Sequence, residues 1–306
     1  MILLKQLKDI LNMHETISAI KLQSKHVNIF KTQLHYLEAG IGDPILFLHG
    51  VPTSSYVWRK IIPYLSNLGR CVALDLPGFG DSAKPAIEYS IFDYIKYVNQ
   101  FIETLNLKNI TLVMHGWGSL IGFDYAMRNE SNCKGLVFYE AFIRPLCDDF
   151  SLPLQEQLSE LQSADAEFDV AVHGDLFVDK IVSQSIIKQL THEEMNQYKK
   201  PFIEQGSGKP LAQYMKELLQ KPDKDKVNDL INSYMKKLIK SSLPKLMLYS
   251  IPGFITSIAT IMWAKEHLSH LEIIEIGEEL HLAQEAYPEQ IGETISVWLQ
   301  GVEQNI

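Results

Sequence analysis

Short apolar runs alternate with helical patterns along the first half of the chain. The runs have the length of strands and lack polar alternation, as strands buried on both faces do. Between them lies a helix signal, in which Ser90 and Asp93 form a capping box ahead of an apolar stripe from Ile91 to Leu105. Strands are expected at 45–48, 71–74, 111–114 and 135–139, with two later ones at 245–249 and 271–276.

This alternation predicts an α/β protein with a doubly wound, mostly parallel sheet. The pattern changes after Pro145, where the chain becomes helical and polar, and a second capping box runs from Thr191 to Glu194. A helical insertion between two halves of a sheet is expected to form a cap over the carboxyl edge, where such folds bind ligands. The predicted parts are a core at 1–147 with an extra helix at 1–20, a cap at 148–222, and the rest of the core at 223–306.

Composition narrows the class of protein. The 306 residues are 46% hydrophobic and 21% charged, which is typical of a soluble globule, and the formal charge of −9 argues against nucleic acid or anionic membrane as partner. Cys71, Cys133 and Cys147 show no metal-binding spacing, so we expect reduced thiols, no metal and a cytoplasmic location. No run is long enough to span a membrane, and lysines interrupt the apolar N-terminus, so no signal peptide is expected.

The strand at 111–114 runs into His115-Gly-Trp-Gly-Ser119, with a helix expected from Leu120. A sharp strand-to-helix turn of this kind presents the nucleophile in many hydrolases. Its apex here is Gly116, which has no side chain to attack with. Neighbouring side chains are poor substitutes as nucleophile. Ser119 lies on the helix past the apex, and Asp124 lies too far along that helix to reach a site at the turn. His115 is interpreted as structural and facing away from the ligand.

Several further segments carry a family resemblance. They are His49 to Pro63, Arg70 to Ser82, Lys134 to Pro145, Leu190 to Phe202, Pro252-Gly253 and Leu280 to Glu285. Together they resemble the haloalkane dehalogenases, α/β-hydrolase-fold enzymes, from about residue 28 to residue 300.

The resemblance implies a mechanism and assigns residues to it. In this family an aspartate at the turn displaces halide and forms an ester, which a histidine with an acid partner then hydrolyses. By position, His281 is the base, Glu140 its acid partner and Trp117 one of the two halide donors. The nucleophile position holds Gly116, and the second donor position holds Val51, whose side chain has no N–H. We expect Glu140 to hydrogen-bond His281 within about 3.2 Å.

Gly116 and Val51 both depart from the family pattern, and both changes affect the dehalogenation reaction. Without the aspartate no covalent intermediate forms, and without a donor at Val51 the halide loses a hydrogen bond worth about 1.5–3 kcal/mol. A base, its acid partner and the backbone N–H groups of Val51 and Trp117 as oxyanion hole would remain. We therefore expect acid/base chemistry by His281 and Glu140 on a small apolar molecule, without cofactor: hydrolysis, elimination or cyclisation. The chain is expected to be a monomer or weak dimer.

Two other functions stay open. In the first, the chain has lost catalysis and acts as a small-molecule binder or scaffold, with His281 and Trp117 as packing residues and Glu140 as a solvated carboxylate. In the second, the chain is a haloalkane dehalogenase whose nucleophile was removed by mutation. Replacing His281 separates an enzyme from a binder, and the mass of the native gene product identifies a mutation.

Overall fold

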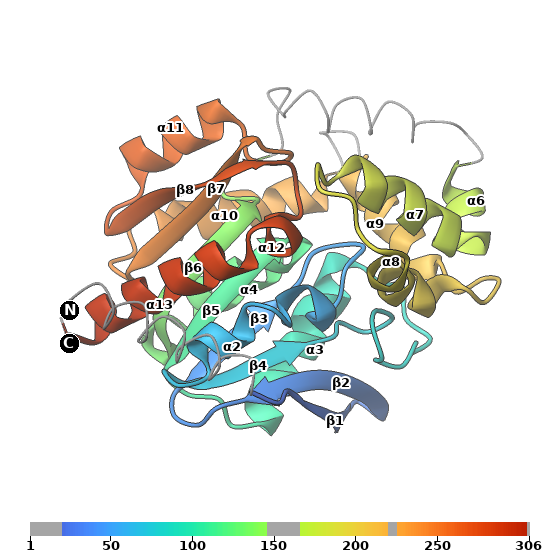
Figure 1. Ribbon diagram of the computed structural model, residues 1–306, viewed down its shortest axis with the longest axis horizontal. Helices are drawn as coiled ribbons and strands as arrows, with labels where there is room; N and C mark the ends of the chain where they lie inside the picture. The colour runs from blue at the N-terminus through green and yellow to red at the C-terminus, as the bar shows by residue number, and fades with distance from the viewer. Residues whose placement is uncertain (1–19, 146–165, 220–224, 305–306) are drawn as a thin grey trace, which may run out of the picture.

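The computed structural model describes residues 20–145, 166–219 and 225–304, and these form an α/β fold around one eight-stranded sheet (Figure 1). The strand order is β1-β2-β4-β3-β5-β6-β7-β8. The first two strands join antiparallel, and all pairs from β4 to β8 are parallel, which confirms the predicted fold class. The strands are β1 (Gln23–Ile29), β2 (Thr32–Ala39), β3 (Pro44–Leu48), β4 (Arg70–Leu74), β5 (Ile110–Gly116), β6 (Cys133–Ala141), β7 (Lys245–Pro252) and β8 (Leu271–Glu279).

Helices cover both faces of this sheet, which is why every residue of β3 and β5 is buried. Helices α3, α4 and α10 pack together on one face, and α2 and α13 pack against each other on the opposite face (Figure 1). The α-helices are α2 (Ile62–Leu65), α3 (Ile91–Thr104), α4 (Trp117–Arg128), α6 (Ala166–Val172), α7 (Gly174–Gln184), α8 (His192–Lys199), α9 (Lys209–Leu218), α10 (Lys226–Leu238), α11 (Ile258–His267), α12 (Ala283–Ala286) and α13 (Pro288–Gln304). Three 3₁₀ turns are η1 (Ser55–Trp58), η2 (Glu130–Asn132) and η3 (Lys200–Phe202).

Both expected capping boxes are present. Ser90 and Asp93 exchange hydrogen bonds at the start of α3, and Thr191 and Glu194 do so at the start of α8. Each pair satisfies backbone N–H groups that the first turn of a helix leaves without partners.

The hairpin of β1 and β2 was not expected. Its two turn residues, Phe30 and Lys31, have φ values of 49° and 66°. Two-residue hairpin turns need such values and usually contain asparagine and glycine, so Phe-Lys carries no turn signal. Strand β1 is also mostly exposed and polar, because it lies at the edge of the sheet, and apolar alternation is therefore weak.

The segment from α6 to α9 lies over the carboxyl edge of the sheet, as a cap would. Tyr214 of α9 packs against Trp117 at the end of β5, and Tyr198 of α8 donates to Glu285, which follows β8. The predicted cap limits at 148 and 222 and the predicted helix at 1–20 lie outside the described residues. Among the described helices none is long and apolar enough to cross a membrane.

Helix α9 also contacts the sheet's own helices through Glu217. This carboxyl is 6% exposed and accepts hydrogen bonds from Ile91 N–H at the start of α3. Burial raises its pKa to about 7, and the charges of Asp93 and Asp225 act in the same direction, while Gln213 and Ile91 oppose them. The carboxyl is therefore protonated in the folded protein at pH values where it ionises in the unfolded chain.

Glu217 is expected to make the protein less stable as pH rises from 5 to 8. A pKa raised in the folded state stabilises below the unfolded value, and this contribution disappears as pH passes through about 7. The shift corresponds to at most about 3 kcal/mol in the free energy of unfolding. Urea unfolding at several pH values should show a smaller decrease for Glu217→Gln than for the wild type. Glu193→Gln, at an exposed site on α8, is the control, and an unchanged profile for Glu217→Gln would contradict the assignment.

Candidate active site

The site forms around the turn between β5 and α4. Gly116 ends β5 with φ 50° and ψ −125°, a backbone conformation that glycine adopts without a Cβ clash. The helix begins at Trp117, so the expected start at Leu120 is wrong by one turn. Gly118 permits the earlier start, because a Cβ there would lie 2.5 Å from the carbonyl oxygen of Leu48.

Glu140 leaves β6 at an irregular position. The register with β5 shifts there, so that Gly116 pairs with Ala141, and Glu140 has φ 50°. Such an irregularity turns a side chain away from its usual direction in the sheet. The carboxylate is 1% exposed and accepts three backbone N–H groups from the loop after β7. Phe254 donates over 3.1 Å, Thr256 over 3.2 Å, and Ile255 lies between them.

His281 is held on three sides. Its Nδ1 donates to Glu140 Oε2 over 3.2 Å, which is the expected hydrogen bond. Its backbone N–H donates to the carbonyl of Ser185, just after α7, over 2.9 Å. Its own carbonyl accepts from His115 Nε2 over 2.9 Å, and the two imidazole rings lie 4.2 Å apart. The side chain therefore has one orientation, with Nε2 directed away from Glu140.

Burial governs the charges of this pair. It lowers the pKa of His281 to about 3, and it raises the pKa of Glu140 to about 7 against the three N–H donors, which stabilise the carboxylate. His281 is consequently neutral at physiological pH, with Nδ1 protonated and the Nε2 lone pair free. A neutral imidazole in this tautomer can accept a proton.

A side chain added at Gly116 would face this nitrogen. A Cβ on Gly116 would lie 3.2 Å from His281 Nε2 and 3.4 Å from Gly50 Cα. Gly50 precedes Val51, which is 4% exposed, so the loop after β3 forms another wall of the site. The structure thus brings Gly50, Gly116, Glu140 and His281 together from four segments, and Val51 is the buried residue that follows Gly50.

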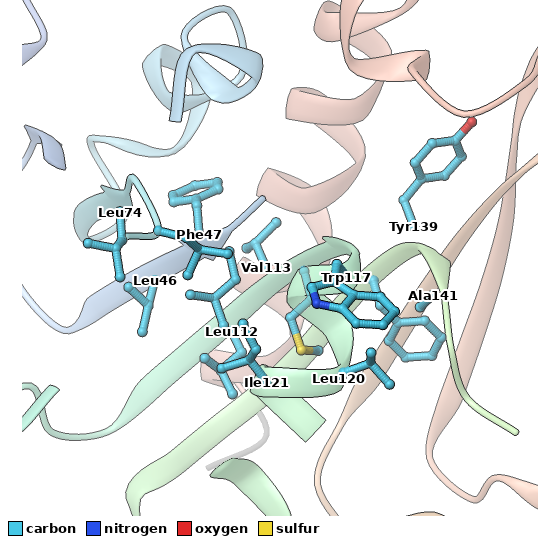
Figure 2. Close-up of a cluster of buried hydrophobic side chains, with 14 of the residues drawn as sticks. Leu46, Phe47, Leu74, Leu112, Val113, Trp117, Leu120, Ile121, Tyr139 and Ala141 are labelled. Carbon is cyan, nitrogen blue, oxygen red and sulfur yellow. The ribbon is translucent and has the colours of Figure 1, made fainter. Parts of the chain in front are cut away.

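Trp117 is buried with its polar atom unsatisfied. The indole is 1% exposed and packs edge-to-face against Phe142 and Tyr214, at centroid distances of 5.8 and 4.9 Å. Figure 2 shows the ring within the cluster of buried apolar side chains that surrounds β5 and α4. Nε1 has no hydrogen-bond partner among the described residues. A buried donor without an acceptor is costly, so this N–H is available to a ligand.

The other residues considered from sequence have structural environments. Ser119 is fully buried and bonds to the carbonyl of Gly116 and the N–H of Phe142, and Asp124 pairs with Arg128 on the surface of α4. Cys71 and Cys133 are buried free thiols, as expected. His115 is buried too, but its contact with the His281 ring gives it a larger part in the site than sequence reasoning assigned. Cys147 lies outside the described residues.

Comparisons with known proteins agree with this architecture. The alpha/beta hydrolase fold family matches residues 43–204. A haloalkane dehalogenase of Mesorhizobium japonicum is 32% identical over 281 residues, which are 90% of this chain and 91% of that protein. A haloalkane dehalogenase of Sphingobium indicum is 31% identical and covers 91% of this chain and 95% of its own length.

Solved structures show the same relationship. The crystal structure of haloalkane dehalogenase DbeA from Bradyrhizobium elkani superposes with a TM-score of 0.89 at 32% identity, covering 94% of this chain and 100% of that one. The dehalogenase DatA from Agrobacterium tumefaciens superposes with a TM-score of 0.86 at 32% identity, covering 92% and 97%. The chain therefore belongs to the haloalkane dehalogenase family of the α/β hydrolases.

Proposed function

We propose that this chain is a family member without a covalent nucleophile, in which His281 and Glu140 carry out acid/base chemistry on an apolar small molecule. The observation that carries the proposal is the position of Gly116. Its absent side chain would lie 3.2 Å from His281 Nε2, while the base remains paired with Glu140 at 3.2 Å. A base held in one tautomer next to an empty nucleophile position can act on water or on the substrate itself.

The surroundings favour an uncharged substrate. The Phe254 ring lies 5.4 Å from the His281 ring, and Trp117, which follows Gly116, packs against Phe142. An unpaired charge buried among these apolar side chains would lose its hydration without compensation. Trp117 Nε1 supplies one side-chain donor for a polar atom of the substrate. Hydrolysis, elimination and cyclisation are all compatible with this set of groups.

The proposal is tested with one neutral probe for each reaction. Styrene oxide tests hydrolysis, a β-hydroxyketone tests elimination, and ethyl γ-hydroxybutyrate tests ring closure. We expect turnover of at least one probe, lowered about 10²- to 10⁴-fold by His281→Phe, which is the usual contribution of general acid–base catalysis. Binding of a probe without turnover, unchanged in His281→Phe, would contradict the proposal and identify a binding protein.

The wild-type chain is expected to release no halide from 1-bromobutane or 1-iodobutane. Gly116 has no side chain to displace the halide, and Val51 donates no hydrogen bond to it. Halide release is followed by ion chromatography, with a haloalkane dehalogenase from a relative as positive control. A rate comparable to that enzyme would show that another residue is the nucleophile.

A further inference from the structure

A serine, a histidine and an aspartate are hydrogen-bonded in series near the edge of the sheet, outside the site around Gly116. Ser24 of β1 bonds through Oγ to Nε2 of His35 on β2 over 2.9 Å. Nδ1 of the same ring bonds to Oδ2 of Asp75, which follows β4, over 2.6 Å. In the sheet order, β2, β4 and β3 separate β1 from β5, which carries Gly116 (Figure 1). The series is therefore a second cluster of polar groups, separate from the one around His281.

The antiparallel register of β1 and β2 brings Ser24 to His35. Ser24 pairs with Leu37, and His26 pairs with His35, so Ser24 and His35 are diagonal neighbours. Residues two positions apart on a strand share one face of the sheet, and a long side chain reaches its diagonal neighbour on the next strand. The sequence patterns did not reveal β1, so this contact could not be predicted from them.

Asp75 fixes the protonation of the His35 ring. The carboxylate is 1% exposed and also accepts the N–H of Ser55 over 2.6 Å and that of Asp81 over 2.9 Å. Burial alone would raise its pKa, but the hydrogen bonds from His35 and from the N–H of Asp81 help to hold the pKa below its usual value. An ionised carboxylate only accepts hydrogen bonds, so Nδ1 of His35 carries a proton and donates it. In the neutral ring Nε2 is then the acceptor, and the Ser24 hydroxyl is the donor.

The three groups have the relation of a nucleophile, a base and a group that orients the base. The distance from Ser24 Oγ to His35 Nε2 lies within the 2.6–3.2 Å over which a general base takes a proton. The His35 ring is 4% exposed, whereas Ser24 lies exposed on the outer strand. No other serine hydroxyl bonds to a histidine ring nitrogen in the described part of the chain. The base is thus held in the protein, and the hydroxyl that it can activate is open to solution.

We propose that Ser24 is a second nucleophilic site, which takes up an acyl or phosphoryl group from a small compound with a good leaving group. The serine oxygen bonds to the carbonyl carbon or the phosphorus while His35 Nε2 takes the hydroxyl proton. The bond to the leaving group breaks, the leaving group departs with the electron pair, and His35 gives the proton to it or to solvent. No atom changes its oxidation state. This inference goes beyond the proposed function and does not depend on His281.

The experiment treats the full chain with diisopropyl fluorophosphate, a member of this class whose serine adduct is stable in water. Intact mass and peptide masses then locate the label. We expect one diisopropylphosphoryl group per chain, on Ser24, with release of fluoride. Ser24→Ala should stay unlabelled, and Ser131→Ala, at an exposed serine of η2, should be labelled like the wild type. A wild-type chain that stays unlabelled at Ser24, or is labelled equally fast at Ser131, would overturn the inference.

His35→Gln distinguishes an activated serine from one that is only exposed. The glutamine amide can still donate to Asp75 but takes up no proton, so we expect the labelling rate to fall about 10²- to 10⁴-fold. His26→Gln is the matched control, because the His26 ring lies 5.2 Å from the His35 ring but is exposed on β1. Its labelling rate should stay at the wild-type level. Equal rates for the wild type and a His35→Gln variant that folds, as judged by circular dichroism, would overturn the inference. If that variant does not fold, the labelling of Ser24 against Ser131 in the wild type still decides.

Discussion

A double variant, Gly116→Asp with Val51→Asn, is expected to release bromide from 1-bromobutane slowly but detectably. The aspartate would supply a nucleophile beside His281, and the asparagine would supply a second side-chain halide donor in addition to Trp117. The structure adds one condition, because the new Cβ would lie 3.2 Å from His281 Nε2 and the imidazole must move by a few tenths of an ångström. The positive φ of Gly116 adds a cost of about 1–3 kcal/mol in stability, which a domain holding about 5–15 kcal/mol can bear.

The matched control carries Gly116→Asn with Val51→Asn. An amide has nearly the same shape as a carboxylate but is no nucleophile, so this variant should release no bromide. Adding His281→Phe to the aspartate variant should change steady release into a single burst, stoichiometric with protein, since the ester would form without being hydrolysed. A folded double variant that binds 1-bromobutane and releases nothing would show that more than two side chains separate this chain from a dehalogenase.

Glu285→Ala is expected to lower the free energy of unfolding by about 3 kcal/mol. Glu285 is 1% exposed and accepts hydrogen bonds from Arg59 at 2.5 and 2.9 Å, from Lys60 at 3.0 Å and from Tyr198 at 2.5 Å. Burial alone would raise its pKa, but the bonds and charges of these partners outweigh burial and hold the pKa below its usual value. Removing the carboxylate leaves the half-buried Arg59 with Glu194 as its one acidic partner among the described residues.

The loss of unfolding free energy in Glu285→Ala should be several times larger than the loss on breaking an ion pair at the surface. Asp124→Ala breaks the exposed pair with Arg128 on α4, and we expect less than about 0.5 kcal/mol there. Urea unfolding monitored by tryptophan fluorescence compares the two variants. Equal losses would mean that the contacts of α8 with the core do not depend on Glu285.

The sign of the pH effect at this cluster is opposite to that at Glu217. A lowered pKa in the folded state stabilises above the unfolded value and loses that contribution as pH falls. At neutral pH Glu285→Gln should therefore be less stable than the wild type, whereas Glu217→Gln should be more stable than it. Both differences should shrink as the solution is acidified, because the wild-type carboxyl groups are then neutral.

The sheet and the site turn were predictable because their signals are local. Mostly apolar runs marked β3 to β8, and the capping boxes at Ser90 and Thr191 marked the starts of α3 and α8. The hairpin of β1 and β2 was missed because Phe30 and Lys31 adopt left-handed conformations without the residues that usually do so. The start of α4 was misplaced because Gly118 resembles a loop residue while serving a close helix contact.

The pairing of Glu140 with His281 was predictable from the sequence, but the backbone groups that hold the two side chains were not. The hydrogen bond of Glu140 to His281 was expected and is present. The N–H groups of Phe254 to Thr256 that hold Glu140, and the carbonyl of Ser185 that holds His281, are backbone groups without a side-chain signature. The contact of His115 with the imidazole depends on the path of the chain between residues that are 166 positions apart.

The most direct test of the central claim, that position 116 is a vacated nucleophile position facing a retained base, is a trapping experiment. The variant Gly116→Asp/Val51→Asn/His281→Phe is incubated with 1-bromobutane, and its intact mass and peptides are measured. We expect one butyl group per chain, on the peptide that contains position 116, and no alkylation of His281→Phe alone. A folded triple variant that stays unmodified, or one alkylated at Glu140 or elsewhere, would contradict it.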